Sequence, residues 1–137
     1  MSTPLFRLMR LHIDVLGTLH LVWGAFGVMT GLSLAILAAG TRAALAGGVF
    51  GMGERAAVAL LASVGGVLML GGAVTVMTGW AIRRRTRRGR LAALVLAIPN
   101  LVLVPFGTAL GVYTFWVLLN NDARRAFGRP PREAPAV

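Results

Sequence analysis

The sequence contains no cysteine and no lysine, and only four of its 137 residues are acidic. The lack of cysteine excludes disulfide bonds, thiol catalysis and thiolate metal sites. With so few acids and only two histidines, there is no acid–base pair and no His/Asp/Ser set of the kind that a membrane hydrolase or acyltransferase needs. We therefore expect a protein that is not an enzyme and that carries no cofactor.

Apolar residues dominate instead: they form 57% of the chain, and the mean hydropathy is +0.78. They gather in three runs, at about 11–39, 56–82 and 91–119. Runs longer than roughly 18 apolar residues are typical of membrane spans rather than of buried core helices. The first run is also longer than the roughly 7–15 apolar residues of a signal peptide. The composition predicts an all-α, polytopic membrane protein of a single domain.

All 14 basic residues are arginines, and the formal net charge is +10. Because they flank the apolar runs, membrane topology and attraction to anionic lipids explain them better than nucleic-acid binding does. Residues 83–90 form a segment that we call the arginine loop. Its arginines are Arg83, Arg84, Arg85, Arg87, Arg88 and Arg90. The positive-inside rule predicts that this loop is cytoplasmic. The N-terminus, with Arg7 and Arg10, lies two spans earlier and is then cytoplasmic too.

The arginine loop admits two interpretations. In the first, it is a topology signal whose side chains are solvated by lipid phosphates. In the second, it is a docking site for an acidic partner or for a specific anionic lipid such as cardiolipin.

The third apolar run, residues 91–119, decides the number of spans. As one helix it would measure about 43 Å, against a hydrocarbon core of about 30 Å. Pro105 lacks a backbone donor and ends a helix. Gly107 offers the permissive backbone of a tight turn, and Thr108 can cap the helix that follows. A reversal at these residues returns the tail, residues 122–137, to the cytoplasm with its four arginines.

The sequence thus predicts a four-helix membrane bundle whose last two helices form a short, proline-kinked hairpin. The expected spans are residues 11–39, 56–82, 91–105 and 108–121. Both termini are expected in the cytoplasm, and of the 14 arginines only Arg42 and Arg55 are expected on the outer side. The pattern leaves open whether the hairpin crosses the bilayer fully or is re-entrant.

Glycines recur at helical spacing along the expected spans. Seven-residue repeats are formed by Gly17, Gly24 and Gly31 and by Gly65, Gly72 and Gly79, and GxxxG pairs are formed by Gly27 with Gly31 and by Gly107 with Gly111. In lipid, helices associate where small residues let their backbones approach closely. These nine glycines are therefore predicted to line tight helix–helix contacts.

Polar side chains within membrane spans are costly, and each one suggests a functional hypothesis. His20 is either a titrating switch or haem ligand, or a neutral imidazole bonded to a backbone carbonyl or to Asn100. Asp14 resembles the acidic residue in the first helix of small four-helix multidrug transporters, but it lies nearer to the cytoplasmic end of its span. Alternatively, it forms an interfacial salt bridge with Arg10, one turn back. Tyr113 needs a partner for its hydroxyl, and with Asp14, His20 and Asn100 it completes a candidate transport path.

The segment Arg83–Phe127 combines the arginine loop, a short helix, the sequence Pro–Phe–Gly–Thr and a final helix containing Gly-x-Tyr. In this it resembles small, uncharacterised four-helix proteins of the bacterial inner membrane. The resemblance implies four helices and an inner-membrane location, and it implies no activity and no site residues.

Two hypotheses for function follow. The first is a non-enzymatic membrane scaffold or accessory subunit, which packs through its glycine faces with itself or with a larger membrane complex and contacts anionic lipids. The second is a small oligomeric transporter or channel that uses Asp14 and His20.

Overall fold

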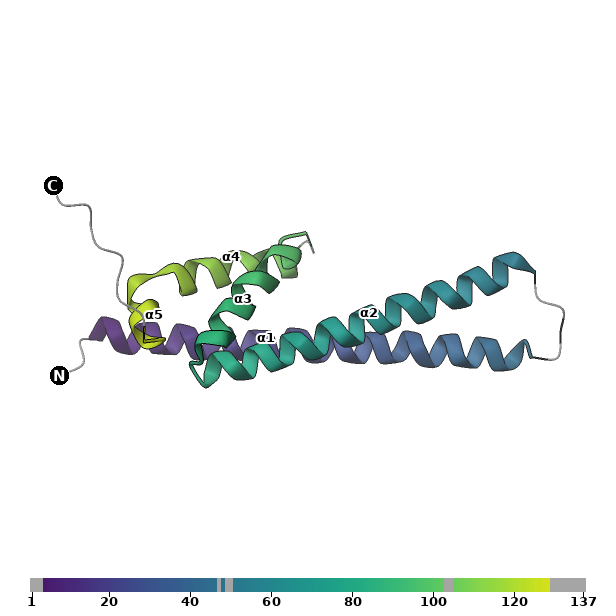
Figure 1. Cartoon of the computed structure of the whole chain (residues 1–137), viewed down its shortest axis with the longest axis horizontal. Coiled ribbons are helices and arrows are strands. Elements are labelled where there is room, and N and C mark those ends of the chain that lie inside the picture. The colour runs from purple at the N-terminus through teal and green to yellow at the C-terminus, as the bar shows by residue number, and fades with distance from the viewer. Residues whose placement is uncertain (1–3, 47, 49–50, 103–104, 129–137) are drawn as a thin grey trace. The chain divides into compact units, whose positions relative to one another are not determined.

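The computed structural model describes residues 4–46, 48, 51–102 and 105–128. In this part of the chain the only regular elements are helices (Figure 1). They are α1 (Pro4–Ala44), α2 (Met52–Arg83), α3 (Arg87–Asn100), α4 (Phe106–Leu119) and α5 (Asn121–Ala126). The prediction of an all-α fold is confirmed. Helix α1 begins at Pro4, before the start of the first expected span.

The helices divide into two compact units, which are described separately. The terminal unit contains Met1–Val22 and Thr75–Val137, and the central unit contains Trp23–Val74. Helices α1 and α2 contribute to both units, whereas α3, α4 and α5 belong to the terminal unit alone.

The helix bounds differ from the expected spans mainly at their ends. The loop expected between the first two spans is shorter, because α1 continues to Ala44 and α2 begins at Met52. The expected arginine loop is largely helical, since α2 ends at Arg83 and α3 begins at Arg87. Helix α5 was not predicted, because residues 122–137 were expected to form a tail. Asn120 caps this helix: its side-chain oxygen accepts a hydrogen bond from the Asp122 amide at 2.9 Å.

The reversal predicted within residues 91–119 is present. Helices α3 and α4 pack against each other, and residues later in α4 contact residues earlier in α3. The Thr108 hydroxyl donates to the Leu101 carbonyl oxygen at 2.8 Å, near the turn. Farther from it, a Cβ built at Gly111 would lie 2.9 Å from the Ala97 carbonyl oxygen. The two helices therefore form an antiparallel hairpin, and Pro99 lies inside its first helix as expected.

The detailed roles predicted at this reversal need correction. Pro105 does not end the first helix of the hairpin, because α3 already ends at Asn100. It is instead the N-cap residue of α4 and makes no side-chain cap hydrogen bond. Gly107 lies in the first turn of α4 and is buried, so it is a packing residue rather than the turn glycine. Thr108 also lies within α4, and its hydroxyl bonds back to α3 instead of capping its own helix. The reversal therefore precedes Pro105.

Glycines bring α1 and α2 together in the central unit. A Cβ built at Gly72 would lie 2.6 Å from the Gly24 carbonyl oxygen, and one built at Gly65 would lie 2.8 Å from the Gly31 carbonyl oxygen. A Cβ built at Gly27 would lie 3.3 Å from the Cα of Gly72. Real Cβ atoms essentially never lie within 3.0 Å of backbone atoms, and a contact of 3.3 Å is tighter than most. Any larger residue here would force the two helices apart.

The same arrangement recurs within the terminal unit. A Cβ built at Gly79 would lie 2.7 Å from the Gly17 carbonyl oxygen, and one built at Gly17 would lie 3.0 Å from that of Gly79. The two seven-residue repeats thus face each other inside the chain, in antiparallel order within each unit. A Cβ built at Gly89, a glycine not selected from the sequence, would lie 2.7 Å from the Ala81 carbonyl carbon. The absence of a side chain at Gly89 therefore lets α3 start directly beside the end of α2.

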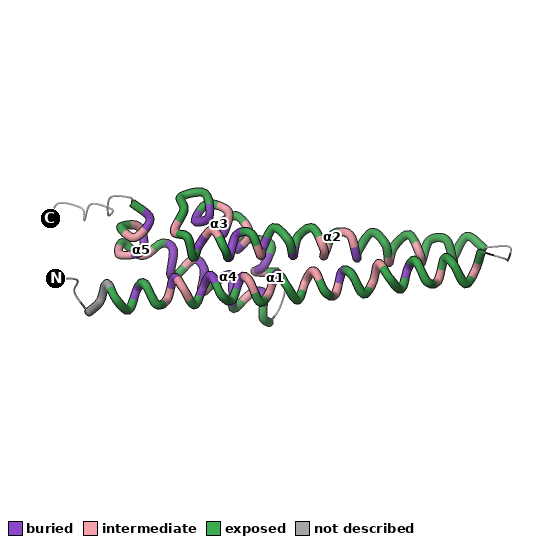
Figure 2. Tube along the Cα trace, turned by 90° about the horizontal axis from the view of Figure 1, so that it is seen from below, coloured by how far each residue is buried: buried purple, intermediate pink, exposed green. Residues whose placement is uncertain are grey.

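Most apolar side chains of the central unit remain exposed, as the predominance of green in this unit in Figure 2 shows. Phe26 and Met29 on α1 are 63% and 68% exposed, and Val67 and Leu70 on α2 are 71% and 72% exposed. By length and composition, α1 over Arg7–Ala44 and α2 over Met52–Arg83 are long and apolar enough to cross a membrane. Helix α4 is apolar but shorter.

Adjacent glycines on α2 provide a matched test of this packing. Gly65→Ala and Gly72→Ala place a methyl group against the α1 backbone, whereas the neighbouring Gly66 and Gly71 face open space. We expect the first two changes to destabilise the protein by about 1–3 kcal/mol, the usual effect of overpacking. Gly66→Ala and Gly71→Ala should be neutral or stabilise the helix by up to ~1 kcal/mol. Thermal unfolding in detergent measures the difference, and equal effects at neighbouring positions would contradict the packing described here.

Candidate functional site

The polar residues singled out in the sequence do not form one connected group. Among the described contacts, none joins any two of Asp14, His20, Asn100 and Tyr113. Asp14 and Tyr113 each interact with a side chain from another part of the terminal unit. His20 bonds to its own helix, and Asn100 is buried at the end of α3, at 7% exposure. The arginine loop, in contrast, makes many contacts.

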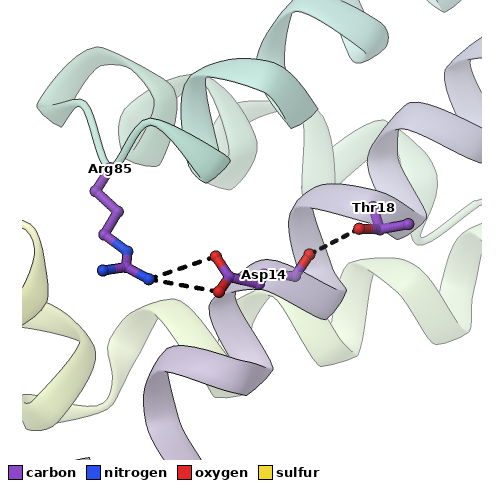
Figure 3. A network of polar contacts seen from close by, with 3 residues as sticks. All are labelled: Asp14, Thr18 and Arg85. Carbon is purple, nitrogen blue, oxygen red and sulfur yellow. Dashed lines mark hydrogen bonds and ion pairs between the residues drawn. The ribbon is translucent and has the colours of Figure 1, made fainter. Parts of the chain in front are cut away.

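Asp14 has a partner that the sequence analysis did not indicate. The Arg85 guanidinium donates to both carboxylate oxygens, at 3.4 and 3.5 Å, while the Thr18 hydroxyl donates to the Asp14 carbonyl oxygen at 2.9 Å (Figure 3). The ion pair is partly exposed on both sides, so its contribution to stability is modest, up to about 1 kcal/mol. It ties α1 to the segment between α2 and α3.

Arg85 makes this contact from an unusual backbone conformation. Its φ is 54°, and it is the one non-glycine residue with a positive φ in the described part of the chain. The Arg85 amide donates to the Ile82 carbonyl and the Thr86 amide to the Ala81 carbonyl, which is the pattern that normally places glycine at this position after a helix. An arginine there is strained by about 1–2 kcal/mol. A glycine would relieve the strain but has no side chain to reach Asp14.

Thr86 then starts α3. Its hydroxyl accepts a hydrogen bond from the Gly89 amide at 3.0 Å and donates to the Ala81 carbonyl oxygen at 3.2 Å. A threonine side chain satisfies an amide that the first turn of a helix cannot pair internally. The end of α2 and the start of α3 are thus fixed by one short set of hydrogen bonds.

Arg90 contradicts the prediction that every arginine of the loop faces lipid or a partner. It is only 5% exposed, and its Nε and one terminal nitrogen donate to the Leu118 carbonyl oxygen at 3.2 and 2.9 Å. Leu118 lies in the last turn of α4, where carbonyls have no partner within the helix and where a positive charge is favourable. Arg90 therefore closes the open end of the α3–α4 hairpin.

Other arginines of the loop also make contacts within the terminal unit. Arg87 donates to the Gly128 carbonyl oxygen at 3.0 Å, just beyond α5. The Arg84 guanidinium lies 3.6 Å from the centre of the Trp80 ring, a cation–π contact. The stem of Arg83 covers Gly17. Arg88 is exposed. The loop is therefore a structural element, which neither interpretation from sequence included.

An aromatic cluster that the sequence analysis missed connects α1 with α4. The His12 Nδ1 and the Tyr113 hydroxyl share a hydrogen bond of 2.9 Å. The Trp116 ring meets His12 edge-on, with centroids 5.4 Å apart, and stacks on Tyr113 at 6.0 Å. The available signal was that a lone tyrosine in an apolar helix needs a partner for its hydroxyl. No sequence pattern identifies His12 as that partner.

His20 is bonded to a backbone carbonyl, one of the partners expected for it. It is fully buried, and its Nδ1–H donates to the Leu16 carbonyl oxygen at 3.0 Å. Its Nε2 has no hydrogen-bond partner among the described residues. The described part of the chain contains no group of three or more His, Cys, Asp or Glu side chains that could share a metal ion.

Comparison with known proteins adds no assignment: no protein-family model, no curated protein and no solved structure matches the chain.

Arg90 and Arg88 form a matched pair for testing the hairpin contact. Arg90→Leu removes two hydrogen bonds from a charged donor to the Leu118 carbonyl, so we expect a loss of about 2 kcal/mol in the free energy of unfolding. Arg88→Leu, at an exposed position, should change it by less than about 0.5 kcal/mol. Arg90→Lys keeps the charge but lacks the forked donors and should fall between the two. Thermal unfolding followed by circular dichroism measures these changes, and similar losses at positions 88 and 90 would refute the role of Arg90.

Proposed function

We propose that this chain is a non-enzymatic integral membrane protein, acting as a scaffold or accessory subunit in the bacterial inner membrane. The observation that carries the proposal is the large exposed apolar surface of the two long helices. Phe26, Met29, Val67 and Leu70 are each more than 60% exposed. Such a surface suits lipid tails or the apolar helices of other membrane proteins.

The association surface differs from the one expected from sequence. The glycine repeats face each other inside the chain, so they are not available to a second protein. We therefore propose that the outward apolar side chains of α1 and α2 form the association surface. This surface would contact either a second copy of the chain or a larger membrane complex.

We further propose four membrane-crossing segments with both termini in the cytoplasm. Contacts in the terminal unit support this side assignment: Arg85 reaches Asp14 near the start of α1, and Arg87 reaches Gly128 at the start of the tail. These contacts gather the basic ends of the chain beside the arginine loop, as the positive-inside rule requires. Helices α3 and α4 have 14 residues each, or about 21 Å against a core of about 30 Å. A thinned local bilayer accommodates such short spans, and a re-entrant hairpin places the tail on the same side.

Protease protection tests this topology. With a tag at each terminus, both tags should be digested in sealed inside-out vesicles, and neither should be digested in intact spheroplasts. Digestion of one tag but not the other in the same preparation would contradict the reversal between α3 and α4 as a membrane hairpin.

One observation favours a second candidate, an oligomeric transporter. The buried His20 has an unpartnered Nε2, and Asp14 lies on the same helix with its carboxylate about half exposed. In this alternative, Asp14 and His20 each take up and release a proton during transport.

Two measurements separate the candidates. The scaffold proposal predicts that the detergent-solubilised protein has a mass of more than one chain, or that it co-purifies with another membrane protein. It also predicts no proton-dependent flux in liposomes. The transporter predicts a flux that Asp14→Asn or His20→Ala abolishes, with Thr18→Ala as the control on the same helix. A lone monomer with no co-purifying protein would refute the scaffold proposal.

A further inference from the structure

The central unit contains a cavity that none of the hypotheses above uses. It has a volume of about 440 Å³ and lies between the end of α1 and the start of α2. Its lining residues are Arg42, Ala46, Arg55, Val58, Ala59 and Ala62. The cavity is open to the surface, since five of its six lining residues are exposed.

The two arginines of this cavity come from different helices and converge on it. Neither guanidinium has a hydrogen bond or ion pair with another part of the described chain. The nearest acid in sequence, Glu54, is engaged elsewhere, since its carboxylate accepts a hydrogen bond from the Gly51 amide at 2.9 Å. Two cations that share one cavity without a counter-charge attract an anionic ligand, and guanidinium groups match phosphate oxygens in geometry.

The rest of the lining is apolar. Val58, Ala59 and Ala62 follow Arg55 at intervals of three, four and seven residues on α2, so they form a strip on one face of the helix, beneath the arginine. Ala46 adds a further small apolar wall. A ligand that fits this lining has an anionic head and an apolar chain.

The positions of the two arginines support the same conclusion. In the proposed topology, Arg42 and Arg55 are the two arginines on the outer side of the membrane, where the positive-inside rule disfavours them. Both line the same cavity. A binding role explains why basic residues occur on that side.

We propose that this cavity binds one anionic phospholipid of the outer leaflet. Its phosphate lies between the Arg42 and Arg55 guanidinium groups, and the first part of an acyl chain runs along Val58, Ala59 and Ala62. The site is distinct from the arginine loop. The inference rests on the proposed membrane location, which the protease experiment checks separately.

Photo-crosslinking in detergent tests the proposal. The probe is phosphatidylglycerol with a photoactivatable group in its acyl chain, and the labelled residues are mapped by mass spectrometry of peptides. We expect labelling at residues 58–62, with phosphatidylcholine carrying the same group labelling this segment much less. Arg42→Gln and Arg55→Gln should each reduce the labelling about fivefold, the usual effect of one basic residue on binding to an anionic lipid.

A change in the apolar lining provides the second arm. Ala59→Leu fills the strip without altering charge and should reduce the labelling, whereas Ala57→Leu, on the opposite face of α2, should leave it unchanged. Unchanged labelling in the double arginine variant, or equal loss in the two alanine variants, would overturn the proposal. Displacement of the lipid by millimolar inorganic phosphate would also overturn it, because the cavity would then be an ion site rather than a lipid site.

Discussion

The structure depends on the close approach of α1 and α2, which is possible only where the facing residues are glycines. At Gly72 and Gly65 a single methyl group would overlap the backbone of α1. In an apolar environment the hydrophobic effect does not drive helices together, so van der Waals contact between backbones must do so. Because the glycines face inward, the bulky apolar side chains point outward and remain exposed. The close packing of α1 against α2 and the apolar outer surface of these two helices therefore both follow from the spacing of the glycines.

The second determinant is the arginine loop, whose charges act on backbone groups as well as on solvent. Helix ends leave carbonyls without partners, and Arg90 supplies two donors to one of them, at Leu118 in the last turn of α4. Arg87 donates to the Gly128 carbonyl, just beyond α5. Arg85 accepts a strained backbone conformation and pairs with Asp14. The composition of this segment suggests a solvated basic patch. Its arginines instead connect α1 with the last helices of the terminal unit.

Much of the fold was predictable, because it follows from local chemistry. The length of the third apolar run and the missing donor of Pro105 predicted the reversal, and the spacing of the glycine repeats predicted a glycine-lined contact between the first two long helices. The contacts of Arg90 and Tyr113 were not predictable, because each depends on which segment returns beside it in space. A periodic pattern specifies the face of a helix, but it does not specify the partner that covers the face. Gly107 was predicted both as a turn residue and as a packing residue, and only the packing role agrees with its buried position in the first turn of α4.

The bond between Arg90 and Leu118 also has a consequence for synthesis of the chain. The ribosome makes Arg90 well before Leu118, whose carbonyl oxygen receives two hydrogen bonds from its guanidinium. This contact can therefore form only after the C-terminal part of α4 has been synthesised, so the open end of the α3–α4 hairpin is the last part of it to close.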